Sequence, residues 1–146
     1  MGDLLQLFKE NIEKEKLFQA GDILLLAVSG GIDSVVLCEL CHQAGFQFMI
    51  AHCNFKLRGE ESERDQKFVE ALAQKYEVRL FLKQFDTNNY VLKNNISVQV
   101  AARELRYQWF NQLADALQKE INSTVRILTA HHADDNVETV LMNFFK

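Results

Sequence analysis

The chain has 146 residues, of which 48% are hydrophobic and 25% charged, and its formal net charge is −4. This length suits one domain with its own core, and the composition is that of an ordinary globular protein. Since we find neither a run of about 18 apolar residues nor a basic and then apolar leader, we expect a cytoplasmic protein with no membrane partner. The acidic balance also argues against a basic face along the whole sequence that would bind nucleic acid.

The predicted elements alternate between helices and strands. In chain order, the apolar pattern predicts a helix over about 3–18, a strand over 23–28, a helix over 34–44, a strand over 46–52, a helix over 60–76, a strand over 78–83, a helix over 97–119, a strand over 124–130 and a helix over 135–145. This alternation is typical of an α/β fold, a parallel sheet with helices on both faces. In such sheets, ligands bind at the carboxyl ends of the strands, near a reversal of strand order.

A glycine-rich loop follows the first predicted strand, and it reads Ser29-Gly30-Gly31-Ile32-Asp33-Ser34. The first N–H groups of a helix attract anions, two glycines let the backbone approach a phosphate, and serine hydroxyls add donors. Asp33 suits a phosphate site if a divalent cation bridges the two, and Mg²⁺ is the cation that this chemistry favours. The segment has neither a P-loop lysine nor a GxGxxG pattern. The alternative is a serine-capped turn in which Asp33 only complements the helix dipole.

Two more polar segments follow predicted strands, at 52–62 and at 131–139. We therefore expect three loops to converge on one edge of the sheet. Paired histidines and aspartates there can supply a proton acceptor, metal ligands and a helix cap. The alternatives are that Asp134 and Asp135 cap the last helix, and that His131 and His132 serve packing. A zinc site is a weaker alternative, because adjacent histidines do not easily face one ion.

The predicted helix from Ser97 carries two arginines outside its apolar stripe. Arg103 is our candidate for a phosphate or transition-state contact, because a guanidinium recognises phosphate with two hydrogen bonds. For Arg106 we prefer the simpler account of a solvated helix with Glu104 beside its arginines.

The chain has three cysteines, and two of them form a C-x-x-C pattern. Cys38 and Cys41 lie inside a predicted helix and have no second pair to complete a zinc site. Buried thiols are therefore favoured over a zinc or redox site.

Four segments together resemble a known family. "AVSGGIDS" resembles the pyrophosphate loop of the N-type ATP pyrophosphatases, which cleave ATP to AMP and pyrophosphate. "AHCNFKLRGEESERDQKFV", "AARELRYQWF" and "TAHHADDNVETVLMNFF" resemble the catalytic domain of the tRNA(Ile)-lysidine synthetases, from Gly21 to Lys146. The resemblance implies a three-layer α/β/α fold with a mostly parallel, five-stranded type of sheet, as in adenine nucleotide alpha hydrolases. It departs at Phe55 and Lys56, where the family often has a His-Gly pair.

The resemblance implies an RNA-modifying ligase. Such an enzyme adenylates the oxygen on carbon 2 of the wobble cytidine in a CAU-anticodon isoleucine tRNA, and the amine of free lysine then attacks that carbon and displaces AMP. The implied ligands and partners are ATP, Mg²⁺, L-lysine and, for the full-length protein, the isoleucine tRNA precursor, and a homodimer is left open. The implied nucleotide-binding residues are Ala27, Ser29, Gly30, Gly31, Asp33, Ser34 and His52, and the metal residues are Asp33 and Asp134. The implied catalytic residues are Asp33, Arg103, His132 and Asp135, and the implied substrate residues are Arg58, Glu61 and His131.

The family usually continues into C-terminal domains that hold the tRNA. We therefore expect residues 1–146 to be the N-terminal ATP pyrophosphatase domain without these domains, and to be inactive on tRNA alone. The alternatives are a tRNA thiolation enzyme with the same loop, which would need a working cysteine pair, and a non-catalytic nucleotide-binding module.

Overall fold

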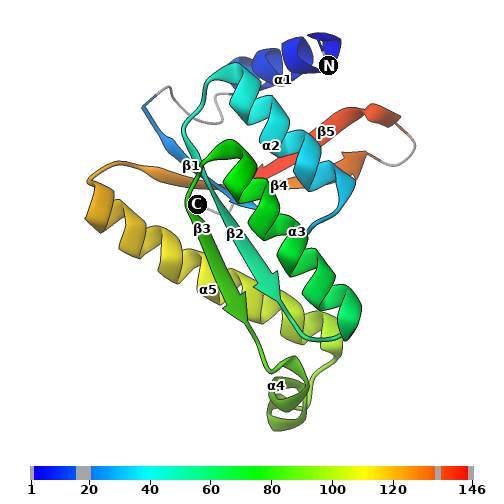
Figure 1. The fold of residues 1–146 in the computed structure, drawn as a ribbon. Helices are drawn as coiled ribbons and strands as arrows, with labels where there is room; N and C mark the ends of the chain where they lie inside the picture. The colour runs from blue at the N-terminus through cyan, green and yellow to red at the C-terminus, as the bar shows by residue number, and fades with distance from the viewer. Residues whose placement is uncertain (1, 16–20, 134–135, 145–146) are drawn as a thin grey trace.

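The computed structural model of the chain describes residues 2–15, 21–133 and 136–144, and it describes side chains over 3–14 and 21–129. The elements are, in chain order, α1 (Gly2–Glu15), β1 (Ile23–Ala27), α2 (Ile32–Ala44), β2 (Phe48–Asn54), α3 (Glu60–Tyr76), β3 (Leu80–Gln84), α4 (Thr87–Asn94), α5 (Val98–Ile121), β4 (Val125–Ala133) and β5 (Asn136–Phe144) (Figure 1). Within this part of the chain, no helix has the length and apolarity needed to cross a membrane.

The strands form one five-stranded sheet in the order β3-β2-β1-β4-β5. The first four are parallel, while β5 runs antiparallel to β4. From β1 the chain moves outward to β2 and β3, and then returns to place β4 on the other side of β1. The order therefore reverses between β1 and β4, which is where ligands bind in sheets of this kind. The expected α/β fold with a mostly parallel sheet is confirmed.

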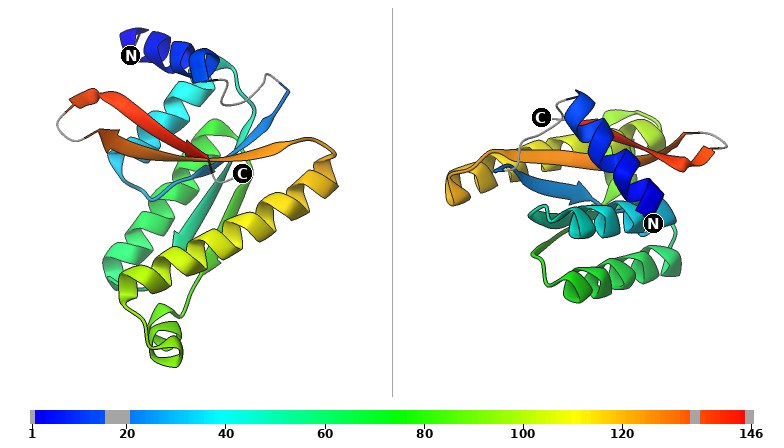
Figure 2. Two further views of the ribbon diagram at one scale, coloured as in Figure 1. Left: turned by 180° about the vertical axis from the view of Figure 1, so that it is seen from behind. Right: turned by 90° about the horizontal axis from the view of Figure 1, so that it is seen from above.

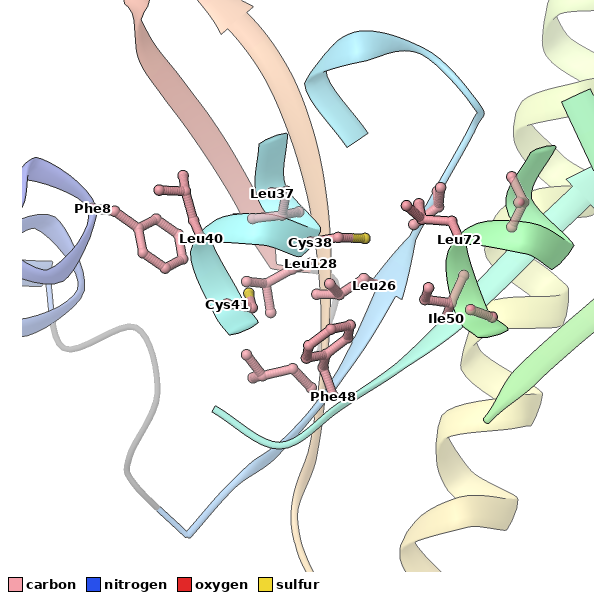
Figure 3. Packing of buried hydrophobic residues seen from close by; sticks show 14 of the residues in the cluster. Phe8, Leu26, Leu37, Cys38, Leu40, Cys41, Phe48, Ile50, Leu72 and Leu128 are labelled. Carbon is pink, nitrogen blue, oxygen red and sulfur yellow. The ribbon is translucent and has the colours of Figure 1, made fainter. Parts of the chain in front are cut away.

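Helices cover both faces of the sheet (Figure 2). α2 and α3 lie on one face and α5 on the other, while α1 packs on α2. The strand period of two explains the two layers: Leu24 and Leu26 of β1 face the core beneath α2 and α3, and Leu25 faces the core beneath α5. Figure 3 shows the first of these cores, in which Leu26 and Ile50 of the sheet lie close to α2 and α3.

The structure adds one helix that the apolar pattern did not predict. α4 begins after Asp86, whose side chain accepts a hydrogen bond from the Asn89 N–H, and is followed by Asn95, which adopts the left-handed conformation. These residue types are typical caps. The helix is only eight residues long, so its apolar positions are too few to form a recognisable stripe.

The helix predicted over 135–145 is wrong. Residues 136–144 form β5, which pairs with β4 from Leu128 opposite Phe144 to Ala133 opposite Asn136, with an irregularity after His132. The physical reason is that β4 would otherwise present an unpaired edge, and the β-branched and aromatic residues of this segment suit a strand that covers it.

Candidate nucleotide-binding site at the carboxyl ends of β1, β2 and β4

Two of the three polar segments predicted to converge, those after β1 and β2, lie at one edge of the sheet, whereas the described residues of the third, 131–139, belong to β4 and β5. Ala27, at the end of β1, lies opposite Ala51 of β2 and opposite Thr129 of β4, and all three strands are parallel. The loop after β1 is therefore next to the reversal of strand order.

The loop after β1 is held in shape by its two serines. The Ser34 hydroxyl accepts a hydrogen bond from the Ser29 N–H (3.1 Å) and shares a second one with the Ser29 hydroxyl (3.1 Å). The Ser29 hydroxyl in turn accepts from the Gly31 N–H (3.2 Å). Gly31 is the N-cap of α2 in an extended conformation, and no side chain caps the helix. The helix N-terminus is thus presented at the sheet edge by an ordered turn, as an anion site requires.

Gly30 needs to be a glycine for two reasons. Its φ is +98°, a conformation that residues with a side chain rarely adopt. A Cβ at this position would also lie 3.3 Å from Cβ of Asp65 and 3.4 Å from its carboxyl group. α3 therefore approaches the loop closely at Asp65, a residue that the sequence reasoning did not single out.

A cavity of about 230 Å³ opens beside the loop, on the α5 side of the sheet. Its floor is apolar, and Arg106 and Tyr107 of α5 form one wall. It is lined by Ala27, Val28, Ser29, Ser34, Ala51, Cys53, Phe55, Arg106, Tyr107, Phe110 and Thr129. Three predicted nucleotide-binding residues, Ala27, Ser29 and Ser34, therefore meet at one cavity.

A second cavity, of about 260 Å³, lies on the α3 side of the same loop. It is lined by Ser29, His52, Cys53, Asn54, Phe55, Leu57, Arg58, Ser62 and Asp65. Two predicted residues, His52 and Arg58, belong to this cavity and not to the first. The cavities share Ser29, Cys53 and Phe55, so a group bound in one lies next to a group bound in the other.

Arg58 is tied to acidic side chains of α3. Its guanidinium donates to Asp65 Oδ2 at 3.1 Å and lies 3.4 Å from Glu61 Oε2, while the side chain remains 66% exposed. The predicted substrate residues Arg58 and Glu61 are thus in contact with each other, and Arg58 lines the second cavity.

The two arginines of α5 differ in position. Arg106 lines the first cavity, and its Nε is buried without a hydrogen-bond partner among the described residues. Arg103 is exposed, and its guanidinium lies 5.8 Å from the ring centre of Tyr107. Arg106 therefore lines the cavity, although the sequence analysis preferred Arg103 as the phosphate contact. The spacing of three residues between the two arginines could not indicate which side chain lies toward the sheet.

The cysteines of the C-x-x-C pattern are buried in the core between α2 and the sheet, as Figure 3 shows. Burial raises the pKa of the Cys38 thiol to about 12 and also raises that of Cys41. Burial likewise raises the pKa of Cys53 to about 12, and the charge of Arg106 partly offsets this. The expectation of buried thiols is confirmed, and thiols with raised pKa values are poor nucleophiles.

The predicted metal-binding residues are Asp33, which the structure describes, and Asp134, which it does not. Asp33 lies in the first turn of α2, and among the described residues no group of three or more His, Cys, Asp or Glu side chains could hold a metal. Mg²⁺ needs only one or two carboxylates when substrate phosphates supply further oxygens, so Asp33 beside the loop fits it.

His131 and His132 lie at the carboxyl end of β4, but their side chains are outside the described part, as are the whole residues Asp134 and Asp135.

Two curated relatives are similar over most of the chain. The tRNA(Ile)-lysidine synthase of Bacteroides thetaiotaomicron is 50% identical over 135 residues, which are 92% of this chain and 30% of the relative. That of Chlorobaculum tepidum is 40% identical over 143 residues, 95% of this chain and 42% of the relative. The chain thus spans less than half the length of either protein.

Solved structures with low identity share the fold. NMN synthetase from Francisella tularensis superposes with a TM-score of 0.56 at 14% identity, over 86% of this chain and 50% of that one. The U34-tRNA thiolase NcsA from Methanococcus maripaludis superposes with a TM-score of 0.55 at 13% identity, over 86% of this chain and 44% of that one. A family model described as a PP-loop domain matches residues 3–146. With the ordered glycine turn at the reversal of strand order, this match shows that the chain belongs to the PP-loop domain family.

Proposed function

We propose that the protein carrying this chain is a tRNA(Ile)-lysidine synthase, which uses ATP to join L-lysine to carbon 2 of the wobble cytidine in an isoleucine tRNA precursor and releases AMP and pyrophosphate. The observation that carries this proposal is the 50% identity to a tRNA(Ile)-lysidine synthase over 92% of the chain. A cytoplasmic location follows from the tRNA substrate, and sedimentation of the purified protein tests whether it forms a homodimer.

In this proposal the loop at Ser29–Gly31 holds the phosphates of ATP. The N-terminus of α2 carries partial positive charge that favours them. Mg²⁺ held by Asp33, with Asp134, would neutralise charge on the departing pyrophosphate. The first cavity takes the adenosine, because its apolar floor is shaped by Ala27 and Phe110 and apolar surfaces suit a purine.

The remaining assignments concern the reacting groups. Arg106, whose Nε has no partner among the described residues, donates to the activated phosphate, and Arg103 assists from the next turn of α5. His132 and Asp135 are proposed as proton acceptors for the attacking amine, and His131 as a substrate contact. The second cavity, at Arg58 and Glu61, takes the other substrate.

A thiolation enzyme with the same loop is disfavoured by the geometry. Such an enzyme needs a reactive cysteine, but Cys38 and Cys41 have no exposed surface and the pKa of each is raised by burial.

The test uses the intact gene product and a CAU-anticodon isoleucine tRNA transcript. We expect ATP-dependent incorporation of labelled lysine, with AMP released in step. Asp33→Ala should lower both signals by at least about a hundredfold, because the charge on pyrophosphate is no longer neutralised. Glu120→Gln, a change at an exposed ion pair with Arg79 far from the loop, is the control and should leave both signals intact. AMP release without lysine incorporation would rule out lysine as the nucleophile.

A further inference from the structure

His52 has a buried ring nitrogen without a partner at the second cavity. Its side chain is 3% exposed, and Nδ1 lies 2.7 Å from the backbone oxygen of Val28. A carbonyl oxygen only accepts hydrogen bonds, so Nδ1 carries the proton in this contact. Nε2 is buried and has no hydrogen-bond partner among the described residues. In the neutral ring Nε2 then offers an unused lone pair, and a buried polar atom of this kind costs free energy unless a ligand or water satisfies it.

The position of His52 on β2 directs the ring to the α3 side of the sheet. Side chains alternate along a strand: Ile50 packs in the core beneath α2 and α3, whereas Ala51 packs in the core beneath α5. His52 therefore shares the face of Ile50, and it lines the cavity on that face and not the adenosine cavity.

The charged side chains at this cavity have a net negative charge, which one bound positive charge would balance. Asp65 and Glu61 both contact Arg58, so these three side chains sum to one negative charge. Two of the other polar groups are already used: the Asn54 amide donates to Gln66 (3.0 Å), and the Ser62 hydroxyl accepts from the Arg58 N–H (3.2 Å).

The two sides of the loop therefore differ in the ligand charge that they favour. The N-terminus of α2 favours an anion, whereas the second cavity offers the lone pair of His52 and the carboxylate of Asp65. A phosphate would meet the Asp65 carboxylate here, while an ammonium group would find two acceptors and a compensating charge.

We propose that the second cavity binds a primary ammonium group through His52 Nε2 and Asp65, and that this group is the side-chain ammonium of lysine. The inference rests on the proposed function for the identity of the amine. Since the two cavities share Ser29, Cys53 and Phe55, the bound nitrogen lies next to the ATP that activates the cytidine. The ammonium group gives up a proton before its lone pair attacks carbon 2 of the cytidine, and AMP leaves from that carbon. His52 is then a residue of the amine subsite and not of the nucleotide subsite to which the family resemblance assigned it.

The experiment measures lysine and ATP binding separately on the intact gene product, by calorimetry. His52→Asn keeps a side-chain donor near the position of Nδ1 and removes Nε2, while Asp65→Asn removes only the charge. We expect each variant to bind lysine at least about tenfold more weakly and to retain its ATP affinity within about twofold. Glu120→Gln is the control that should change neither. A lysine affinity that both variants retain would overturn the subsite.

A second measurement needs no variant. In the unaltered chain with ¹⁵N-labelled histidine, we expect the Nε2 resonance of His52 to report an unprotonated nitrogen and to shift when lysine or cadaverine is added. Norleucine, which has a methyl group in place of the side-chain ammonium, should leave it unmoved. No shift at saturating lysine, or an equal shift with norleucine, overturns the inference. A chain that binds ATP but gives no lysine response overturns the subsite alone, whereas a lysine response at His52 without ATP binding overturns the proposed function and leaves the amine subsite standing.

Discussion

Gly30 is the residue at which backbone conformation and packing act together on the loop. Both Gly30 and Gly45 have a positive φ (+98° and +80°), but only Gly30 is crowded, because no atom lies within 4 Å of a Cβ built at Gly45. We expect Gly30→Ala and Gly45→Ala each to lower the free energy of unfolding by about 1 kcal/mol or more. Only Gly30→Ala should also weaken ATP binding, because its methyl group presses on Asp65 across the loop.

Urea unfolding and ATP calorimetry of the two alanine variants check this prediction. An equal ATP affinity in both would mean that the close approach of α3 to Gly30 does not matter for the loop.

Lys56 is a residue in a conformation that suits glycine. Its φ is +55°, and its N–H donates to the Asn54 side chain at 3.0 Å. We expect Lys56→Gly to raise the free energy of unfolding by up to about 1 kcal/mol, because the left-handed conformation costs a residue with a Cβ about that much. Lys67→Gly, in the interior of α3, is the matched control and should lower it by about 1 kcal/mol. Chemical denaturation of both variants decides the matter, and a destabilised Lys56→Gly would contradict the reasoning.

At the scale of elements, a polar contact joins α2 to α3. The Tyr76 hydroxyl donates to Glu39, and this hydrogen bond is the largest cause lowering the pKa of Glu39. Burial, followed by the same contact, raises the pKa of Tyr76. We expect Tyr76→Phe to lower the free energy of unfolding by about 1 kcal/mol at neutral pH, the usual value for one hydrogen bond.

The pH dependence of this contact follows from the lowered pKa of Glu39. A carboxyl group whose pKa is lower in the folded state stabilises the fold above its ordinary pKa, and this contribution disappears as the pH falls through the folded-state value. The difference between the parent and Tyr76→Phe should therefore stay constant near neutral pH and shrink as the pH falls below the ordinary pKa of a glutamic acid carboxyl group. A difference that stays constant in urea unfolding over this range would show that Glu39 does not accept the bond.

The elements differ in how well sequence alone predicts them, and the reason is physical. β1 and α2 were predictable because a continuous apolar run next to a helical stripe has few other solutions. α4 was not predicted because its eight residues carry caps but too few apolar positions. β5 was missed because the identity of its partner, the open edge of β4, depends on the order of the strands and not on local sequence.

At the scale of the molecule, the sheet explains how much of the site was predictable. The convergence of the loops after β1 and β2 follows from parallel pairing, which alternating elements imply. The selection of Arg106 over Arg103 for the cavity wall could not be predicted, because it depends on the rotation of α5 about its axis when it packs on the sheet. The separation of His52 from the first cavity likewise depends on which face of β2 each helix covers.

The two cores on opposite faces share the strands of one sheet, and this predicts how the molecule unfolds. Leu37 is fully buried on the α2 face, whereas Trp109, the single tryptophan of the sequence, packs against Phe85 and Phe110 on the α5 side. If the sheet couples the two cores, Leu37→Ala should lower the free energy of unfolding by about 2–5 kcal/mol. The fluorescence of Trp109 should report that loss from across the sheet, with the same midpoint as circular dichroism.

Leu92→Ala is the control, since Leu92 is 81% exposed and its truncation should change the free energy by less than about 0.5 kcal/mol. Urea titrations followed by both signals test the coupling. A Trp109 transition that stays in place while the circular dichroism midpoint falls would mean that the α5 side unfolds independently. The first cavity, which Arg106 and Phe110 of α5 line, would then persist without the α2 core, whereas a shared transition would tie the candidate nucleotide-binding site to the packing of both faces.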